Sequence, residues 1–189
     1  MTKNITVNDE PFVLYLSEKK IKSRVRQLAK QVSKEYKGRT PIFIGILNGS
    51  FIFMADLIRH VTIDCEIDFL KLSSYGDAKI SSGNVKLLKE LNCDVEGRDI
   101  IIVEDIVDSG LSVDFMSKLV SQHNPRSFKI ISLLYKKDAI KVDVPIHFIG
   151  FKIPNFFVIG YGLDYGQKAR NLRGIYRLNE KKTKKENTR

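Results

Sequence analysis

A run of apolar residues in the middle of the sequence leads directly into three carboxylates and two hydroxyls. Residues 100–103 are Ile-Ile-Ile-Val, and Glu104, Asp105, Asp108 and the Ser-Gly-Leu-Ser sequence at 109–112 follow them. Such a run is typical of a buried parallel strand whose carboxyl end carries the acids and whose next loop opens a helix. Backbone N–H groups in such a loop bind phosphate, and carboxylate oxygens suit ribose hydroxyls or magnesium. The segment therefore predicts a sugar-phosphate site.

The alternative interpretation of this segment is an acidic strand-to-helix turn that binds nothing. Three neighbouring carboxylates repel one another unless a cation or hydroxyl lies beside them, which favours a binding site. Residues 104–110, Glu-Asp-Ile-Val-Asp-Ser-Gly, resemble the phosphoribosyl pyrophosphate (PRPP) motif of the type I phosphoribosyltransferases, in the form used by their purine branch. The chain is similar to the hypoxanthine-guanine phosphoribosyltransferases from about residue 12 to residue 175.

The resemblance implies a role for each residue of the motif. Glu104 and Asp105 would hold the ribose hydroxyls of PRPP, and Asp108 would be the general base near N7 of the purine. The backbone and hydroxyls of Ser109, Gly110, Leu111 and Ser112 would bind the 5-phosphate. Threonine is common in the family where Ser109 and Ser112 stand, and both residue types supply a hydroxyl.

Three further stretches correspond to the family's pyrophosphate site. Leu47, Asn48 and Gly49 follow an apolar run, and the family has there a cis peptide bond whose N–H binds pyrophosphate; the sequence does not show whether the bond is cis. Ser74 and Tyr75 correspond to a mobile loop that closes over pyrophosphate and excludes water. Arg170 corresponds to the arginine that clamps pyrophosphate. Taken alone, the first two stretches are ordinary turns or surface loops.

The remaining correspondences concern the purine and a metal ion. Lys136 would donate to the 6-oxo group, which distinguishes hypoxanthine and guanine from adenine. Phe157 would stack on the purine, and the backbone of Val158 would meet its pyrimidine edge. In the family, an aspartate at the position of Asp164 coordinates Mg²⁺ shared with pyrophosphate; Glu104 and Asp105 are the other candidate ligands. Without this context, Lys136 would be a solvated charge and Phe157 part of a core strand.

The elements that position these residues alternate along the chain. We expect strands at residues 41–47, 63–69, 100–103, 128–134, 146–151 and 156–160, and helices within 19–39 and at 51–60 and 112–123. Ser17 is the expected N-cap of the first helix, and Gly38 its expected stop. Such alternation predicts an α/β fold with a parallel sheet, whose ligands bind beyond the carboxyl ends of the strands. The resemblance adds a small hood subdomain to the phosphoribosyltransferase core.

Length and composition fit a single domain at residues 1–178. The chain has 189 residues, of which 43% are hydrophobic. We expect a mobile loop at about 71–86 and a basic, frayed tail at 179–189. The absence of a long apolar stretch and of a signal-type start predicts a cytoplasmic protein without a membrane partner.

Several other functions are disfavoured by the sequence. Cys65 and Cys93 have neither metal-binding nor redox spacing, and His60, His123 and His147 match no functional position, so we expect inert thiols and no zinc site. No P-loop motif is present. The formal charge of +10 attracts anions in general and does not by itself indicate nucleic acid.

The predicted activity is transfer of 5-phosphoribosyl from PRPP to N9 of hypoxanthine or guanine, giving IMP or GMP and pyrophosphate, with Mg²⁺ as cofactor. The partners expected are PRPP and the 6-oxopurine, no nucleic acid, and further copies of the chain in a homodimer or homotetramer. One alternative is a PRPP-sensing, nucleic-acid-binding regulator of the same fold; another is an enzyme acting on adenine, orotate or uracil. The preference between guanine and hypoxanthine, the use of xanthine, the oligomeric state and the role of the tail stay open.

Overall fold

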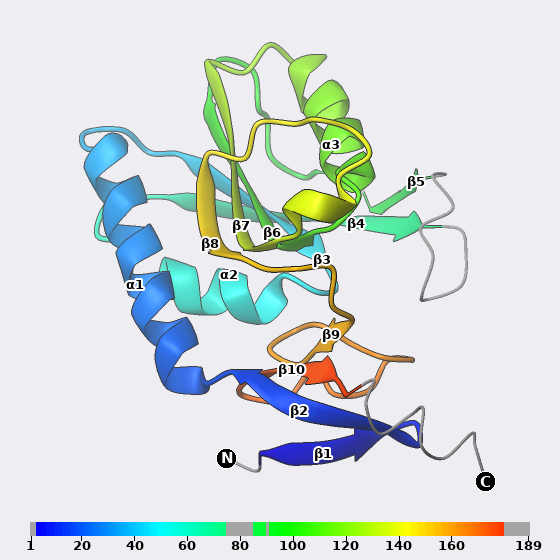
Figure 1. Cartoon of the computed structure of the whole chain (residues 1–189). Helices are drawn as coiled ribbons and strands as arrows, with labels where there is room; N and C mark the ends of the chain where they lie inside the picture. The colour runs from blue at the N-terminus through cyan, green and yellow to red at the C-terminus, as the bar shows by residue number, and fades with distance from the viewer. Residues whose placement is uncertain (1–2, 75–84, 90, 180–189) are drawn as a thin grey trace, which may run out of the picture.

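The central element is a six-stranded sheet with the order β5-β4-β3-β6-β7-β8. The computed structural model describes residues 3–74, 85–89 and 91–179. Five strands are parallel, and only β5 runs antiparallel, against β4. The strands are β3 (Ile42–Leu47), β4 (Glu66–Ser74), β5 (Val85–Lys89), β6 (Asp99–Val107), β7 (Ser127–Tyr135) and β8 (Phe148–Lys152). The predicted α/β fold with a parallel sheet is confirmed (Figure 1).

Helices cover both faces of this sheet. On one face lie α1 (Glu18–Glu35) and α2 (Phe51–Ile58), and on the other lies α3 (Leu111–Ser121). In β6, Ile101 and Val103 pack in the first layer, whereas Ile100 and Ile102 pack in the second. Because both faces of β6 are buried, its residues 100–103 are apolar without alternation. A 3₁₀ turn at Lys137–Ala139 follows β7.

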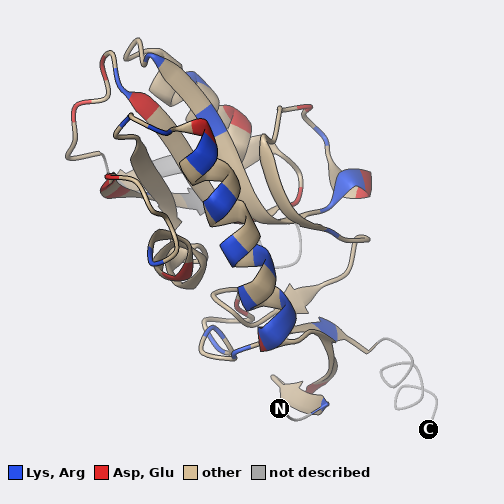
Figure 2. Cartoon of the chain, turned by 90° about the vertical axis from the view of Figure 1, so that its left-hand side faces the viewer, with Lys and Arg blue, Asp and Glu red and all other residues tan. Residues whose placement is uncertain are grey.

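Helix α1 forms where its periodicity and caps predict. The side chain of Ser17 accepts a hydrogen bond from the N–H of Lys20 at 3.4 Å, and Gly38 has a φ of +76° just beyond the helix end. Its apolar stripe is fully buried, and its lysines and arginines lie outside this stripe, along the helix (Figure 2). Arg24 leans toward the edge strand β8, where it donates to the carbonyls of Ile149 at 2.7 Å and Gly150 at 2.8 Å.

A second sheet forms the hood from both ends of the described chain. It contains β1 (Asn4–Val7), β2 (Glu10–Leu16), β10 (Ile175–Leu178) and β9 (Val158–Ile159), in that order and all antiparallel. Phe12, Ile159 and Tyr176 are its buried core. β1, β2 and β10 were not predicted from the sequence, because the strands of this small sheet alternate only weakly.

The segment predicted as a strand at 63–69 and a loop at 71–86 is corrected by the structure. β4 begins at Glu66 and continues to Ser74, and β5 begins at Val85 and pairs with it. The backbone N–H and C=O groups of the two strands bond to each other, so polar residues can form strands here. Their composition is that of a loop, and it therefore did not indicate the strands. Residues 75–84 of the predicted loop, including Tyr75, lie outside the described residues, as do residues 180–189 of the tail.

The two cysteines are partly buried. Cys65 and Cys93 are free. Burial raises the pKa of both thiols, and for Cys93, which also lies beside Asp68, the pKa is about 11. None of the helices in the described part of the chain is long and apolar enough to cross a membrane.

Candidate active site

The predicted phosphate loop lies between β6 and α3. Asp108, Ser109 and Gly110 connect the strand to the helix, and Leu111 and Ser112 are the first two residues of α3. The backbone carbonyl of Ser109 accepts from the N–H of Lys141 at 2.9 Å, which fixes the loop to the segment after β7. The N–H groups of the first helical turn have no partner within the helix, so they can bind an anion.

Two adjacent carboxylates are buried where β6 ends. Glu104 is 6% and Asp105 9% exposed. Burial raises the pKa of Asp105 to about 6, although its hydrogen bond from the N–H of Ile106 and the charge of Arg170 act in the opposite direction. Burial and the neighbouring Asp105 also raise the pKa of Glu104 well above its usual range. A cation or a hydroxyl donor bound beside them would therefore stabilise the ionised form of both carboxylates.

The turn after β3 packs directly on Asp105. The Leu47–Asn48 peptide bond is cis, as in the family that the sequence resembles. Gly49 lies against the Asp105 carboxylate so closely that no Cβ atom would fit, which explains the glycine. Ser50 is buried and donates through Oγ to the carbonyl of Ile46 at 2.7 Å, which closes the turn ahead of α2.

Arg170 and Asp164 reach this turn from the hood side. Arg170 donates to the carbonyl of Gly162 at 2.8 Å, and its guanidinium lies 2.7 Å from the Asp164 carboxylate. Gly162 in turn packs on the carbonyl of Gly49, again without room for a Cβ atom. Arg170 lowers and Asp164 raises the pKa of Asp105, so both charges lie near that carboxylate. The structure thus brings together two of the three segments predicted to bind pyrophosphate, the turn at Gly49 and Arg170, beside Asp105.

The predicted base and the predicted purine donor form an ion pair. The Lys136 ammonium lies 2.7 Å from the Asp108 carboxylate. The Lys136 side chain is only 7% exposed, whereas that of Asp108 is 52% exposed. Lys136 is thus a buried cation held at the carboxyl end of β7, not the solvated charge of the alternative interpretation.

Phe157 packs in an aromatic cluster that was not predicted from the sequence. Tyr165 meets it edge-on with ring centroids 5.2 Å apart, and Phe12 lies 6.1 Å away. Val158 follows in β9, paired with Arg177 of β10. The roles of Phe12 and Tyr165 had no signal in the sequence beyond their aromatic type, because no periodicity links residue 12 to residue 157.

The predicted metal ligands do not form one cluster. No group of three His, Cys, Asp or Glu side chains within residues 3–74, 85–89 and 91–179 is arranged to hold a metal ion. Asp164 is instead engaged by Arg170 and by the N–H of Gln167 at 2.8 Å. Carboxylates with raised pKa values still fit a hard cation, and Mg²⁺ usually keeps waters and substrate oxygens as ligands. Ser74 ends β4, and Tyr75 lies outside the described residues.

Comparison with known proteins identifies relatives of the whole domain. The phosphoribosyl transferase domain model matches residues 15–166. The hypoxanthine-guanine phosphoribosyltransferase of Bacillus subtilis is 45% identical over 157 residues, 83% of this chain and 87% of the relative. The hypoxanthine phosphoribosyltransferase of Escherichia coli is 44% identical over 159 residues, 83% of this chain and 89% of the relative. A crystal structure of a hypoxanthine-guanine phosphoribosyltransferase from Bacillus anthracis superimposes with a TM-score of 0.83 at 40% identity, covering 88% of this chain and 98% of that one.

Proposed function

The chain belongs to the phosphoribosyltransferase family, within its hypoxanthine-guanine branch, and from this membership we propose that it salvages purines by transferring 5-phosphoribosyl from PRPP to a 6-oxopurine. The C1′–oxygen bond to pyrophosphate breaks, and a bond from C1′ to N9 of hypoxanthine or guanine forms. The products are IMP or GMP and pyrophosphate. The purine loses a proton in this step, which a carboxylate can accept.

The observation that carries this proposal is the Lys136–Asp108 pair beside the phosphate loop. A buried ammonium can donate to the 6-oxo group, whereas the amino group of adenine offers no acceptor there. Asp108, half-exposed in the same pair, would take or share the proton near N7. Adenine is therefore disfavoured as an acceptor, whereas orotate and uracil are disfavoured by the purine-specific relatives. No observation favours a PRPP-sensing regulator.

A second group of residues would hold pyrophosphate and the ribose phosphate. The Arg170 guanidinium would stabilise the charge that builds on the leaving pyrophosphate. Glu104 and Asp105 would accept hydrogen bonds from the ribose hydroxyls, and the loop 109–112 would bind the 5-phosphate. Mg²⁺, when bound, would neutralise part of the pyrophosphate charge, with Asp164, Glu104 and Asp105 as the protein groups that could hold it or its waters.

A comparison of Asp108→Asn with the unchanged protein tests the proposal. We expect kcat to fall by roughly a hundred-fold or more, because general acid–base catalysis contributes about that much. Affinity for PRPP should change by only a few-fold, since Asp108 faces the base. Each of hypoxanthine, guanine, xanthine and adenine is supplied singly with Mg²⁺ and PRPP, and nucleotides are measured by chromatography.

Asp138→Asn is the matched control, because Asp138 is an exposed carboxylate on the 3₁₀ turn next to Lys136. It should leave turnover unchanged. Absence of turnover with every 6-oxopurine would contradict the proposed function, and equal turnover by Asp108→Asn would remove the proposed base.

We further expect a cytoplasmic homodimer or homotetramer engaged in IMP biosynthesis. This expectation rests on the family, whose members are usually oligomers. The large apolar side chains exposed in the described structure are Phe51 at 43%, Ile67 at 47% and Leu88 at 54%; they lie on three different elements, and single exposed apolar residues are ordinary on a protein surface. Light scattering on the purified protein distinguishes the assemblies.

A further inference from the structure

Residues 160–163 form a tight turn that breaks a local rule of backbone conformation. Gly160 and Leu163 pair across an antiparallel bridge, and the two residues between them, Tyr161 and Gly162, have φ values of +54° and +101°. Positive φ at both central positions is the combination of type I′ turns, which strongly prefer Asn, Asp or Gly at the first of them. A bulky aromatic residue there is an outlier that requires a reason.

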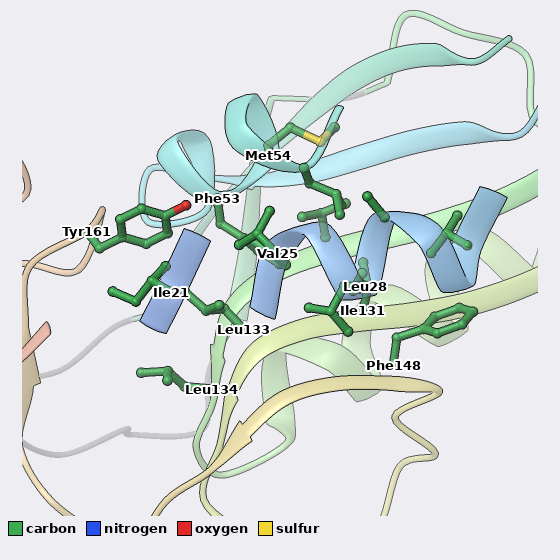
Figure 3. Close-up of a cluster of buried hydrophobic side chains, with 14 of the residues drawn as sticks. Ile21, Val25, Leu28, Phe53, Met54, Ile131, Leu133, Leu134, Phe148 and Tyr161 are labelled. Atoms are coloured by element: carbon green, nitrogen blue, oxygen red, sulfur yellow. The ribbon is translucent and has the colours of Figure 1, made fainter. Parts of the chain in front are cut away.

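The reason is the anchorage of the Tyr161 side chain. Tyr161 is only 4% exposed and belongs to the same core cluster as Ile21 of α1 and Phe53 of α2 (Figure 3). Its hydroxyl donates to the carboxylate of Asp56, in the last turn of α2, at 2.7 Å. Burial and the adjacent Asp56 raise the pKa of the Tyr161 phenol far above its usual range, so the phenol stays a donor.

The anchored turn holds the parts of the site that face pyrophosphate. Gly162 rests on the carbonyl of Gly49, and its own carbonyl accepts from Arg170 at 2.8 Å. Gly49 in turn contacts the carboxylate of Asp105. Because α2 follows the 48–50 turn directly, the Tyr161–Asp56 hydrogen bond joins the two backbone segments between which pyrophosphate would lie.

We propose that Tyr161 is a positioning residue for the proposed reaction: through Asp56 it fixes the 160–163 turn over the 48–50 turn and so sets the affinity of the site for PRPP and pyrophosphate. This inference rests on the proposed function for its kinetic readout only. It assigns no contact between Tyr161 and a substrate. In the purine half of the site, Lys136 lies on another element, and Phe157, although it precedes the turn in the chain, packs on Phe12 of β2, so this half should not respond.

The test combines Tyr161→Phe with changes at its partner. We expect Tyr161→Phe to raise the KM for PRPP and the Kd of Mg²⁺–pyrophosphate, measured by calorimetry, by roughly three- to ten-fold, the effect of one buried hydrogen bond. The KM for hypoxanthine at saturating PRPP should stay unchanged. Asp56→Asn keeps an oxygen acceptor and should retain most of the affinity, whereas Asp56→Leu should reproduce Tyr161→Phe. The double variant should be no worse than either single one.

Tyr36→Phe is the matched control. Tyr36 is also buried, but it lies beside Asp99, at the opposite end of β6 from the site. Loss of its hydroxyl should therefore leave the KM values for PRPP and hypoxanthine unchanged. Unchanged PRPP and pyrophosphate affinities in Tyr161→Phe would overturn the inference. So would equal increases in both KM values accompanied by a lower Tm, the result of a purely structural role. Calorimetry measures pyrophosphate binding without any turnover. A protein that binds pyrophosphate but has no transferase activity would therefore contradict the proposed function and not the role of Tyr161.

Discussion

Among single residues, Asp105 shows most clearly how the ligand-free site is organised for binding. It is buried beside Gly49, and burial raises its pKa from 3.8 to about 6. A carboxylate with a raised pKa costs the folded protein free energy once it ionises, because ionisation is easier in the unfolded chain. A ribose hydroxyl or a cation that binds there recovers this free energy. The carboxylate therefore lowers the stability of the free enzyme in favour of its complex.

A pH series on Asp105→Asn measures this cost. Below about pH 4 the carboxyl is protonated in both states, so the variant and the unchanged protein should be equally stable. As the pH rises through about 6, the unchanged protein loses stability and the variant does not. At pH 8 we expect the variant to be more stable by up to roughly 3 kcal/mol, while it binds PRPP poorly.

Urea unfolding at several pH values provides this measurement. The exposed Asp143→Asn is the control and should show no pH-dependent gain. A variant that is equally or less stable at pH 8 would show that ionised Asp105 is not a cost to the fold.

The sequence was sufficient to predict the part of the site formed by residues that are neighbours in the chain. It was much less informative about contacts between distant segments. The segment 104–112 forms as expected because strand, loop and helix follow one another directly. Lys136 and Gly49 also meet it predictably, since parallel strands bring their carboxyl ends to one edge. Arg170 and Asp164 were assigned only through family resemblance, because their position depends on the hood. The contact of Tyr161 with Asp56 joins residues 105 positions apart, and no local pattern encodes it.

Among the elements, the β4–β5 hairpin depends on one buried carboxylate. Asp68, 7% exposed, accepts hydrogen bonds from the N–H of Phe69 at 2.7 Å, Asn92 at 2.6 Å and Cys93 at 3.1 Å. Burial alone would raise the pKa of Asp68, but these donors hold it at about 2. Asp68 thus ties the chain that follows β5 to β4, and it fixes the base of the hairpin whose connecting residues correspond to the family's catalytic loop.

Asp68→Asn should therefore destabilise the fold by about 2 kcal/mol at neutral pH, because an amide lacks the charge that three donors stabilise. A lowered pKa contributes stability above the ordinary value of 3.8, and this is lost as the pH falls through about 2. The difference between the two proteins should accordingly narrow below pH 4. Chemical unfolding at pH 7 and near pH 3 checks this, with the exposed Asp64→Asn as control. A pH-independent difference would contradict the argument.

Length and composition together separate the elements that could be predicted from the sequence from those that could not. β6 and α1 were predicted because one contains the uninterrupted apolar run at 100–103 and the other has an apolar residue on every turn. β9 lies within the strand expected at 156–160, although only two of those residues are in the strand. β1 and β10 have four residues each, which is too short for either period to be recognised. β4 and β5 were taken partly for a loop because serine, glycine and lysine dominate that segment.

On the scale of the whole molecule, charge favours one substrate over the other. The chain carries a formal charge of +10, and α1 displays much of it on its outer face (Figure 2). PRPP is a polyanion and hypoxanthine is neutral at pH 7, so only PRPP gains from the field of the protein. The KM for PRPP should rise several-fold from low salt to roughly 0.3 M salt, because screening shortens the range of that field.

Initial rates at constant free Mg²⁺, with each substrate varied in turn, measure this effect. The KM for hypoxanthine at saturating PRPP is the internal control and should stay constant. Equal salt dependence for both substrates would mean that salt acts on the fold or on catalysis and not on the attraction of PRPP.

The position of Arg24 on β8 has a consequence for how the protein behaves in a crowded cell. β8 is the last strand of the main sheet, and an open edge can recruit a strand from another molecule. The Arg24 guanidinium occupies two of its carbonyls, those of Ile149 and Gly150, with donors that belong to the same chain. The helix that covers the core thus also protects this sheet edge, so that the protein resists polymerisation through strand addition.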